Sequence, residues 1–113
     1  MKTVNERNSL TLRVEFSDAD DAPSAPATAH WRLDCVTSNK QLQDWTAFTP
    51  VAIYDELGNV SAIQSDISVD AALNAIQQDG NRREIKEFTV AAELDTAGEY
   101  SESLQYAVIN RKR

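Results

Sequence analysis

The chain has 113 residues, of which 42% are hydrophobic, as expected for one domain with its own core. Its formal net charge is −7, from 18 acidic and 11 basic residues. This excess of acid argues against a nucleic-acid-binding protein and against docking on anionic membranes, so we expect neither among its partners. The single cysteine excludes an intrachain disulfide and suits a reducing compartment.

The N-terminal residues 1–8 contain no apolar run, so we do not expect a secretory signal there. They also lack apolar periodicity. We interpret residues 1–8 as an N-terminal arm that adds little to the core and carries assembly contacts. Residues 9–113 are then predicted to form a single β-sandwich domain.

The next residues alternate between apolar and polar side chains, which predicts half-buried strands. Residues 10–16 form the first such pattern. Turn formers and two prolines in residues 17–26 predict a loop that also carries assembly contacts. Residues 28–36 form the second strand, whose inward side is expected to consist of Ala29, Trp31, Leu33 and Cys35.

The middle of the chain predicts three further strands. Residues 42–49 form one around Trp45, and we expect Trp45 and Trp31 to be the large core residues. Residues 51–55 form a short strand that ends before a turn at Gly58 and Asn59. Residues 63–69 alternate again and predict another strand.

Residues 70–78 change period and predict a two-turn helix that crosses between the sheets. Asp70 is expected to cap its N-terminus, and Gly80 to end it. Leu73 and Ile76 lie three residues apart, so they would face the core together.

The last third of the chain predicts a long antiparallel hairpin with arms at residues 84–94 and 100–110. The expected inward residues are Phe88, Val90, Ala92, Leu94, Tyr100, Leu104, Tyr106 and Val108, with the polar Glu102 breaking the series. Trp31, Leu33, Phe88 and Val90 share an alternation phase and are predicted to lie in one core. The pattern as a whole predicts an all-β fold, an immunoglobulin-like two-sheet β-sandwich of about seven strands with one short connecting helix.

The sequence offers few candidates for catalysis. His30 points outward on its strand, whereas Cys35, five residues later, points inward as a buried and unreactive thiol. A nucleophilic site needs its base beside the nucleophile, so we predict no catalytic residue and no enzyme activity. With three glycines there is no phosphate-binding loop, and we expect no cofactor.

The cluster of Asp18, Asp20 and Asp21 resembles the start of a calcium loop. The EF-hand pattern then requires glycine and glutamate where this chain has Pro23 and Ala29. We therefore predict no metal site and a solvated turn in which each aspartate bonds its own backbone. A looser carboxylate site stays open as the alternative.

Charged residues of the last hairpin are interpreted as a solvated face rather than as a glycosidase site. They are Glu84, Glu87, Glu93, Glu99 and Glu102. The short basic runs at residues 82–83 and 111–113 have two open interpretations. They either pair with the acidic face of a neighbouring subunit or discourage aggregation at a strand end.

One stretch of the chain resembles small structural proteins of tailed bacteriophages. A strand ending in a phenylalanine, Phe16, is followed by an acid-rich loop with Pro23-Ser-Ala-Pro26 and then by Trp31-Arg-Leu-Asp34. Later matches are Asp44-Trp-Thr46 and Glu87-Phe-Thr-Val90. The resemblance covers most of the chain, apart from an extra hairpin at residues 51–63, and its motifs are structural.

The resemblance implies a non-enzymatic virion structural protein without catalytic residues. The main expectation is a capsid decoration or cement protein that stabilises the shell by multivalent contacts. Its partners would be the major capsid protein, or tail and neck proteins, and further copies of itself. It would reside in the virion, and in the host cytoplasm during assembly.

Two alternatives remain. One is a head-to-tail connector or tail tube component. The other is a carbohydrate- or receptor-binding β-sandwich module on a fibre, which would need an exposed aromatic platform. Tyr54, Phe48 and Tyr100 are the candidates for that platform.

Overall fold

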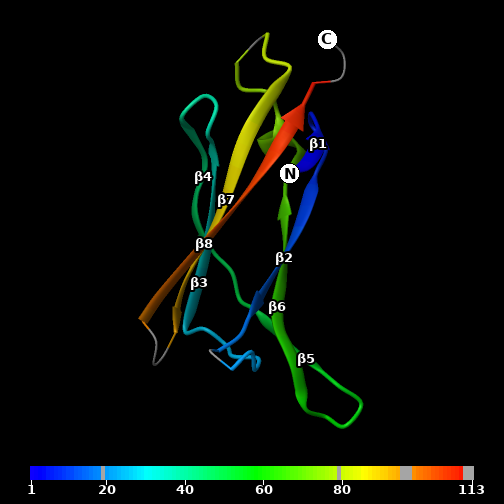
Figure 1. The fold of residues 1–113 in the computed structure, drawn as a ribbon, viewed down its shortest axis with the longest axis vertical. Coiled ribbons are helices and arrows are strands. Elements are labelled where there is room, and N and C mark those ends of the chain that lie inside the picture. Colours follow the sequence, from blue (N-terminus) through cyan, green and yellow to red (C-terminus); the bar gives the residue numbers. More distant parts are fainter. Residues whose placement is uncertain (19, 79, 95–97, 111–113) are drawn as a thin grey trace.

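The computed structural model describes residues 1–18, 20–78, 80–94 and 98–110. These residues form eight strands in two sheets, and most of the described residues lie in strands (Figure 1). The expected all-β class is confirmed. Within the same residues, no helix has the length and apolar character required to cross a membrane.

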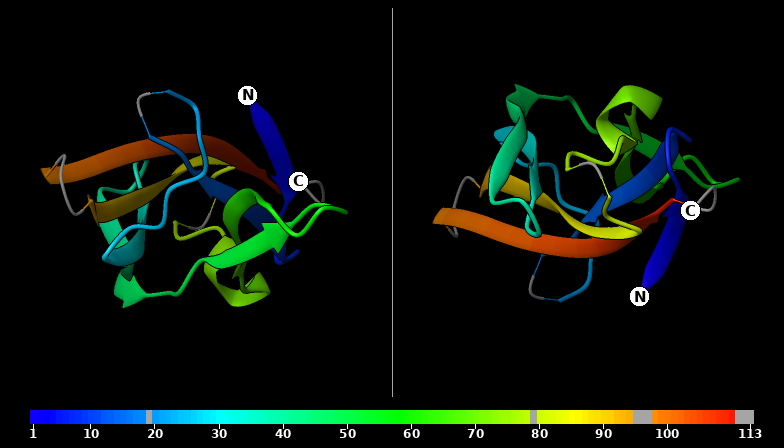
Figure 2. Two further views of the ribbon diagram at one scale, coloured as in Figure 1. Left: turned by 90° about the horizontal axis from the view of Figure 1, so that it is seen from below. Right: turned by 90° about the horizontal axis from the view of Figure 1, so that it is seen from above.

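The two sheets differ in size. The larger has the strand order β1 (Lys2–Asn5), β8 (Gly98–Ile109), β7 (Arg83–Leu94), β3 (Thr28–Cys35) and β4 (Lys40–Ala47). The smaller has the order β2 (Leu10–Phe16), β6 (Val60–Val69) and β5 (Val51–Tyr54). All neighbours are antiparallel except β1, which runs parallel to β8. Seen along the long axis, the β7–β8 hairpin crosses one side of the molecule (Figure 2).

The predicted hairpin at the end of the chain is confirmed. β7 and β8 pair without interruption from Arg83 opposite Ile109 to Leu94 opposite Gly98. On β7 the inward residues Phe88, Val90 and Ala92 are buried, as the alternation predicts. On β8 the pattern holds only in the C-terminal half, residues 105–109, where Tyr106 and Val108 are buried. In the N-terminal half, residues 98–104, Tyr100 and Leu104 are exposed. These are the upper and lower halves of β8 as it is drawn in Figure 1. The side chain of Leu94 lies outside the described part.

The core lies between the two sheets and contains the four residues predicted to share it. The rings of Trp31 and Phe88 stack with their centroids 5.6 Å apart, and Leu33 and Val90 belong to the same buried cluster. The smaller sheet contributes Leu10, Leu12, Phe16, Ile63, Ile67 and Val69. Burial of these apolar side chains is the main source of stability for the fold.

Trp45 is not a core residue, contrary to the prediction. Its side chain is exposed, and the guanidinium of Arg32 lies 5.4 Å from its ring centroid on the outer face of the sheet. The register of β4 explains the difference. Thr46 pairs with the inward Trp31, and irregularities follow between Trp31 and Leu33, so Trp45 turns outward.

The predicted helix over residues 70–78 is also wrong. Only Ala71–Asn74 form a single 3₁₀ turn, and the Asp70 side chain makes no capping hydrogen bond. The backbone N–H groups of Ile76, Gln77 and Gln78, which a helix would use internally, donate instead to the carboxylates of Glu6 and Glu84. Leu73 and Ile76 do pack against the core, as expected.

The N-terminal residues form more than an arm. Lys2–Asn5 form β1, which pairs with residues 106–109 of β8, and Val4 joins the core cluster. Glu6 and Arg7 continue the attachment, since Glu6 N donates to Ile109 O at 2.8 Å and Arg7 N to Asn74 O at 3.0 Å. β1 is therefore a strand beyond the roughly seven that the sequence predicts.

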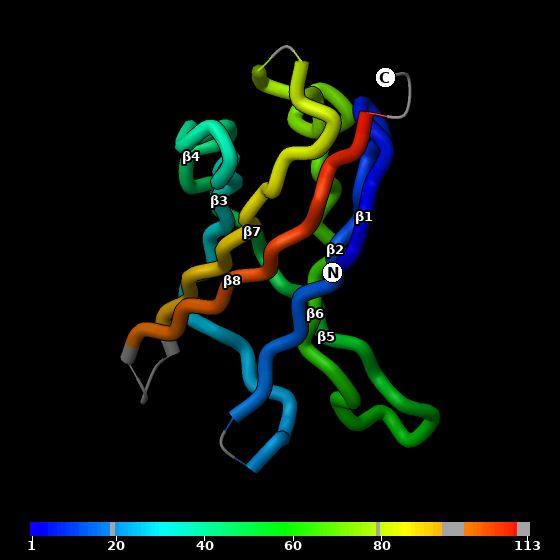
Figure 3. The backbone as a smooth tube through the Cα atoms, turned by 45° about the horizontal axis from the view of Figure 1, so that its top comes forward, coloured from blue at the N-terminus to red at the C-terminus, as the bar shows by residue number. Residues whose placement is uncertain are grey.

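The molecule is elongated, with principal extents of 52 × 30 × 21 Å. The hairpin of β5 and β6 extends away from the rest at one end, near the proline loop of residues 17–27 (Figure 3). A hollow of about 260 Å³ is lined both by Asp21 and Pro23 of that loop and by Ser61 and Ala62 of β6. The loop and the hairpin are thus neighbours on one end of the molecule.

Candidate functional site

The residues considered for catalysis lie apart. His30 is half-buried on the outer face of β3, where its cross-strand neighbours are Ala47 and Ala91. Cys35 is buried on the inner face, with its Sγ atom 3.6 Å from Oε1 of Glu84. A histidine and a thiol on opposite faces of one strand have no geometry for joint nucleophilic chemistry.

Of the three loop aspartates, Asp18 is the one whose side chain is shown bonding to the backbone of its own loop. Oδ1 of Asp18 accepts hydrogen bonds from the N–H groups of Asp20 at 2.9 Å and Ala22 at 3.0 Å. This is the local bonding that an aspartate in a turn commonly makes. Across the described ranges, no group of three or more histidine, cysteine, aspartate or glutamate side chains is placed to hold a metal ion.

The glutamates of the last hairpin do not form one solvated face. Glu93, Glu99 and Glu102 are exposed, and Glu87 accepts a hydrogen bond from Gln105 at 3.1 Å. Glu84 is completely buried, which contradicts its assignment to the polar face. The alternation itself carried the signal, because Glu84 and Lys86 have the same phase along β7 as Phe88 and Val90.

Glu84 belongs to a buried polar cluster, defined here as Asn74, Glu84, Lys86 and Tyr106. Nζ of Lys86 lies 3.1 Å from Oε1 of Glu84 and also donates to the backbone oxygen of Ala75 at 3.1 Å. The Tyr106 hydroxyl donates to Oδ1 of Asn74 at 2.7 Å. Nδ2 of Asn74 donates to the backbone oxygen of Asn8 at 2.8 Å.

The polar cluster is closed to solvent and serves the fold. All four side chains are fully buried, and their hydrogen bonds hold residues 74–78, Asn81 and the N-terminal segment onto the large sheet. Burial raises the pKa of Tyr106, so its hydroxyl keeps its proton as a hydrogen-bond donor. The cluster is therefore closed to a substrate, and its hydrogen bonds hold these segments of the fold together.

The charge on Glu84 makes stability depend on pH. Burial by itself would raise the pKa of Glu84, but hydrogen bonds from Gln77, Asn81, Gln78 and Lys86 outweigh it and hold the pKa at about 2, below the ordinary 4.5. A pKa lowered by folding stabilises the protein fully above the unfolded value. We expect about 3 kcal/mol of stability to be lost as the pH falls from 4.5 through 2.

Chemical denaturation at a series of pH values measures this loss. The Glu84→Gln variant should be less stable at neutral pH and should lose much of the acid dependence. Glu93→Gln, an exposed carboxylate on the same strand, is the matched control and should keep the wild-type dependence. Equal acid sensitivity in Glu84→Gln and wild type would contradict the assignment.

The β5–β6 hairpin exposes an unusual number of apolar side chains. Among described residues, ten large apolar side chains are exposed, and five of them lie within residues 51–60. They are Val51, Ile53, Tyr54, Leu57 and Val60. We call these five the apolar hairpin surface.

The tip of this hairpin is a hydrogen-bonded turn. Oδ1 of Asp55 accepts hydrogen bonds from the N–H groups of Leu57 and Asn59, both at 2.9 Å. Gly58 has a φ of +83°, a conformation that glycine adopts without strain. Leu57 therefore stands on an ordered turn while 86% of its surface is exposed.

The residues considered for an aromatic platform are not brought together. Phe48 packs against Phe16 with ring centroids 6.2 Å apart, so the core occupies it. Tyr54 lies on the small sheet and Tyr100 on the large one. Of the basic runs, Arg82 and Arg83 are exposed, and residues 111–113 lie outside the described part.

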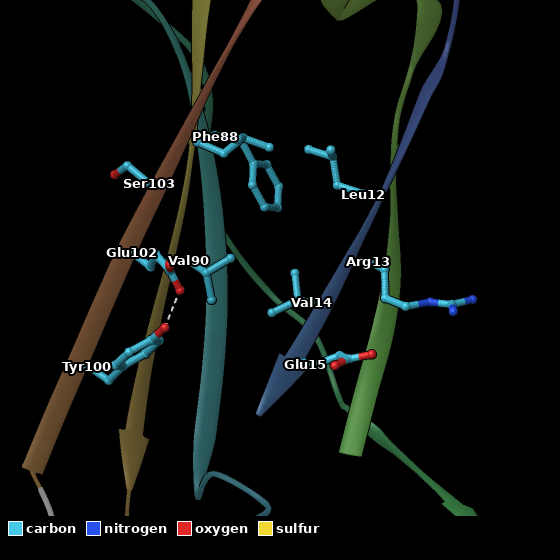
Figure 4. A pocket seen from close by; sticks show the side chains of 10 residues that line it. Leu12, Arg13, Val14, Glu15, Phe88, Val90, Tyr100, Glu102 and Ser103 are labelled. Carbon is cyan, nitrogen blue, oxygen red and sulfur yellow. Dashed lines mark hydrogen bonds between the residues drawn. The ribbon is translucent and has the colours of Figure 1, made fainter. Parts of the chain in front are cut away.

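A groove opens between the edge of β2 and the lower half of β8 (Figure 4). Its volume is about 280 Å³. Leu12 and Val14 of β2 face Phe88 and Val90 of β7 across it, and residues 100–104 of β8 form the other wall. We call this the β2–β8 groove.

In comparisons with known proteins, no family model, no curated protein and no solved structure matches this chain. Its own surface is therefore the basis for assigning a function. That surface offers an apolar hairpin on an ordered tip and an open groove at a sheet edge, and its polar cluster is sealed.

Proposed function

We propose that this protein is a non-enzymatic structural component of a tailed-bacteriophage virion, most specifically a capsid decoration protein that stabilises the shell. The observation that carries the proposal is the apolar hairpin surface. Five large apolar side chains exposed on one short hairpin favour a site of interaction with another protein. Four of the five lie on the paired strands β5 and β6 and Leu57 on a hydrogen-bonded turn, so little conformational entropy is lost on docking.

The strand order supports the finer fold assignment that this function implies. Immunoglobulin-like sandwiches place strands B, E and D in one sheet and strands C, F and G in the other. The order β2-β6-β5 opposite β8-β7-β3 corresponds to that arrangement. β1 then occupies the edge beside the last strand, and β4 the opposite edge.

The mechanism is repetition of a modest contact. The hairpin and the proline loop at the same end of the molecule would touch a neighbouring shell subunit. One such contact is weak, but symmetry repeats it over the particle, so that occupancy rises through avidity. The excess of negative charge keeps the unassembled protein soluble.

Co-sedimentation with particles made by the encoding phage tests this function. The protein should sediment with intact capsids and remain in solution without them. On the order of hundreds of copies per particle would indicate decoration, and about six or twelve would indicate a neck or tail ring. Absence from purified particles would contradict a virion role.

The apolar hairpin surface makes a direct prediction. Leu57→Asp should abolish loading onto particles and leave the melting temperature unchanged, because the side chain contributes to a contact and not to the core. Val36→Asp makes the same change at another exposed apolar residue and should load normally. Normal loading of Leu57→Asp would exclude this hairpin as the docking element.

A further inference from the structure

The smaller sheet ends at β2, whose edge facing away from β6 has no strand paired with it among the described residues. In the part of the chain that the structure describes, it has three strands where the larger has five, and β6 is the one strand that pairs with β2. At the end of β2 the backbone oxygen of Phe16 accepts a hydrogen bond from the N–H of Ser24 at 3.2 Å. The other edge of β2 runs beside the β2–β8 groove. A strand edge of this kind presents backbone N–H and C=O groups to whatever lies beside it.

Opposite that edge, part of the inner face of β8 in the larger sheet is exposed to solvent. Along the inner face of β8, Tyr106 and Val108 are fully buried, whereas 46% of Leu104 and 40% of Tyr100 are exposed. β1 accompanies β8 only at residues 106–109 and leaves the lower half without it. The exposed part of β8 therefore lies beyond the segment that pairs with β1.

The groove has the dimensions and apolar lining that an extended chain requires. The groove is lined by residues 12–15 of β2, which correspond to about 13 Å of strand. Leu12 and Val14 on one wall and Leu104 on the other are separated by the buried Phe88 and Val90. Alternate side chains of an added strand would point into this lining, because successive side chains on a strand point to opposite faces.

The charges beside the groove favour a basic ligand. Glu15 and Glu102 both line it. Arg13 turns to Asp66, with Nε and Oδ1 2.9 Å apart, so its charge is already compensated. Because the whole chain carries a net charge of −7, a second copy brings repulsion, whereas a basic segment is attracted.

We propose that the β2–β8 groove binds an extended basic segment of a partner protein, which adds to β2 as a fourth strand of the smaller sheet. Its alternate apolar side chains cover Leu104 and Phe88, and its lysine or arginine side chains meet Glu15 and Glu102. Main-chain hydrogen bonds to β2 supply affinity, and the apolar lining supplies register. The inference rests on the proposed function in that the partner is a neighbouring virion subunit.

Binding of a synthetic peptide to the purified protein tests the inference. The probe is a nine-residue peptide of alternating valine and lysine, and the control peptide has the same composition in scrambled order. Calorimetry measures affinity, and amide chemical shifts locate the bound peptide. We expect the alternating peptide to bind about tenfold more tightly than the scrambled one, with the largest shifts at residues 10–16.

A matched pair of variants tests the groove itself. Leu104→Lys should weaken peptide binding about tenfold, while Val36→Lys, with the same charge change at a residue 45% exposed, should bind as wild type. Both variants should melt like wild type, since both side chains are exposed. Equal affinity for the two peptides, or equal effects of the two variants, would overturn the inference.

Two further outcomes also decide the matter. Self-association that Leu104→Lys abolishes would identify a second copy as the occupant and overturn the basic partner. A protein that loads onto particles through its hairpin but ignores the alternating peptide would refute this inference alone. The proposed function fails separately, when the protein is absent from particles.

Discussion

Replacing Trp31 with alanine is expected to destabilise the domain by about 3–5 kcal/mol, the usual cost of truncating a large buried aromatic side chain. Trp31 is buried between the sheets and stacks on Phe88 with ring centroids 5.6 Å apart. Its removal deletes apolar contacts and leaves a cavity that the two sheets can only partly close. Urea denaturation of the wild type and the variant measures the difference.

Trp45→Ala is the matched control for this prediction. It removes the same atoms from an exposed side chain that lies against Arg32 on the outer face of the sheet. We expect a cost of about 1 kcal/mol or less, from the lost cation–π contact. If Trp31→Ala melts like wild type, or if the two variants are equally destabilised, the core assignment is wrong.

The second large effect is expected for Lys86→Met. This change leaves the buried carboxylate of Glu84 without its partner charge and the backbone oxygen of Ala75 without its Lys86 donor. Breaking a buried pair by removing one partner typically costs about 3–5 kcal/mol. The loss should be visible at neutral pH as a lower midpoint of chemical denaturation.

The double variant Glu84→Gln with Lys86→Met separates the pair from its surroundings. It removes both charges, so no uncompensated charge stays buried. We expect the double variant to be more stable than the sum of the two single effects implies, by about 1 kcal/mol or more. Interaction energies between contacting residues are typically about 0.5–3 kcal/mol. Strictly additive effects would show that Glu84 and Lys86 do not act as a pair.

The buried pair also explains the path of the chain between the sheets. Glu84 accepts hydrogen bonds from the backbone N–H groups of Gln77 and Gln78, and Lys86 donates to the backbone oxygen of Ala75. These bonds hold residues 75–78 in a non-helical path. The polar cluster thus selects one conformation for a segment whose local pattern favours another.

The sequence by itself determined the strands whose two faces differ in burial. Residues 10–16 and 28–35 are strands within one residue of the predicted bounds, and the hairpin arms are also found. Alternation is a local signal, because adjacent side chains on a strand point to opposite faces. That Trp31 and Phe88 share one core could be predicted from the phase of the apolar and polar alternation along their strands.

The tertiary structure decided everything that depends on distant partners. The outward turn of Trp45 depends on how β4 pairs with β3, and β1 forms because residues about a hundred positions later supply its edge. The chain at residues 75–78 is not helical because Glu84 and Lys86 form hydrogen bonds with its backbone groups. The apolar hairpin surface and the β2–β8 groove also depend on distant partners. The exposure of a side chain depends on which strands cover its face of the sheet, and no local pattern of residues specifies that.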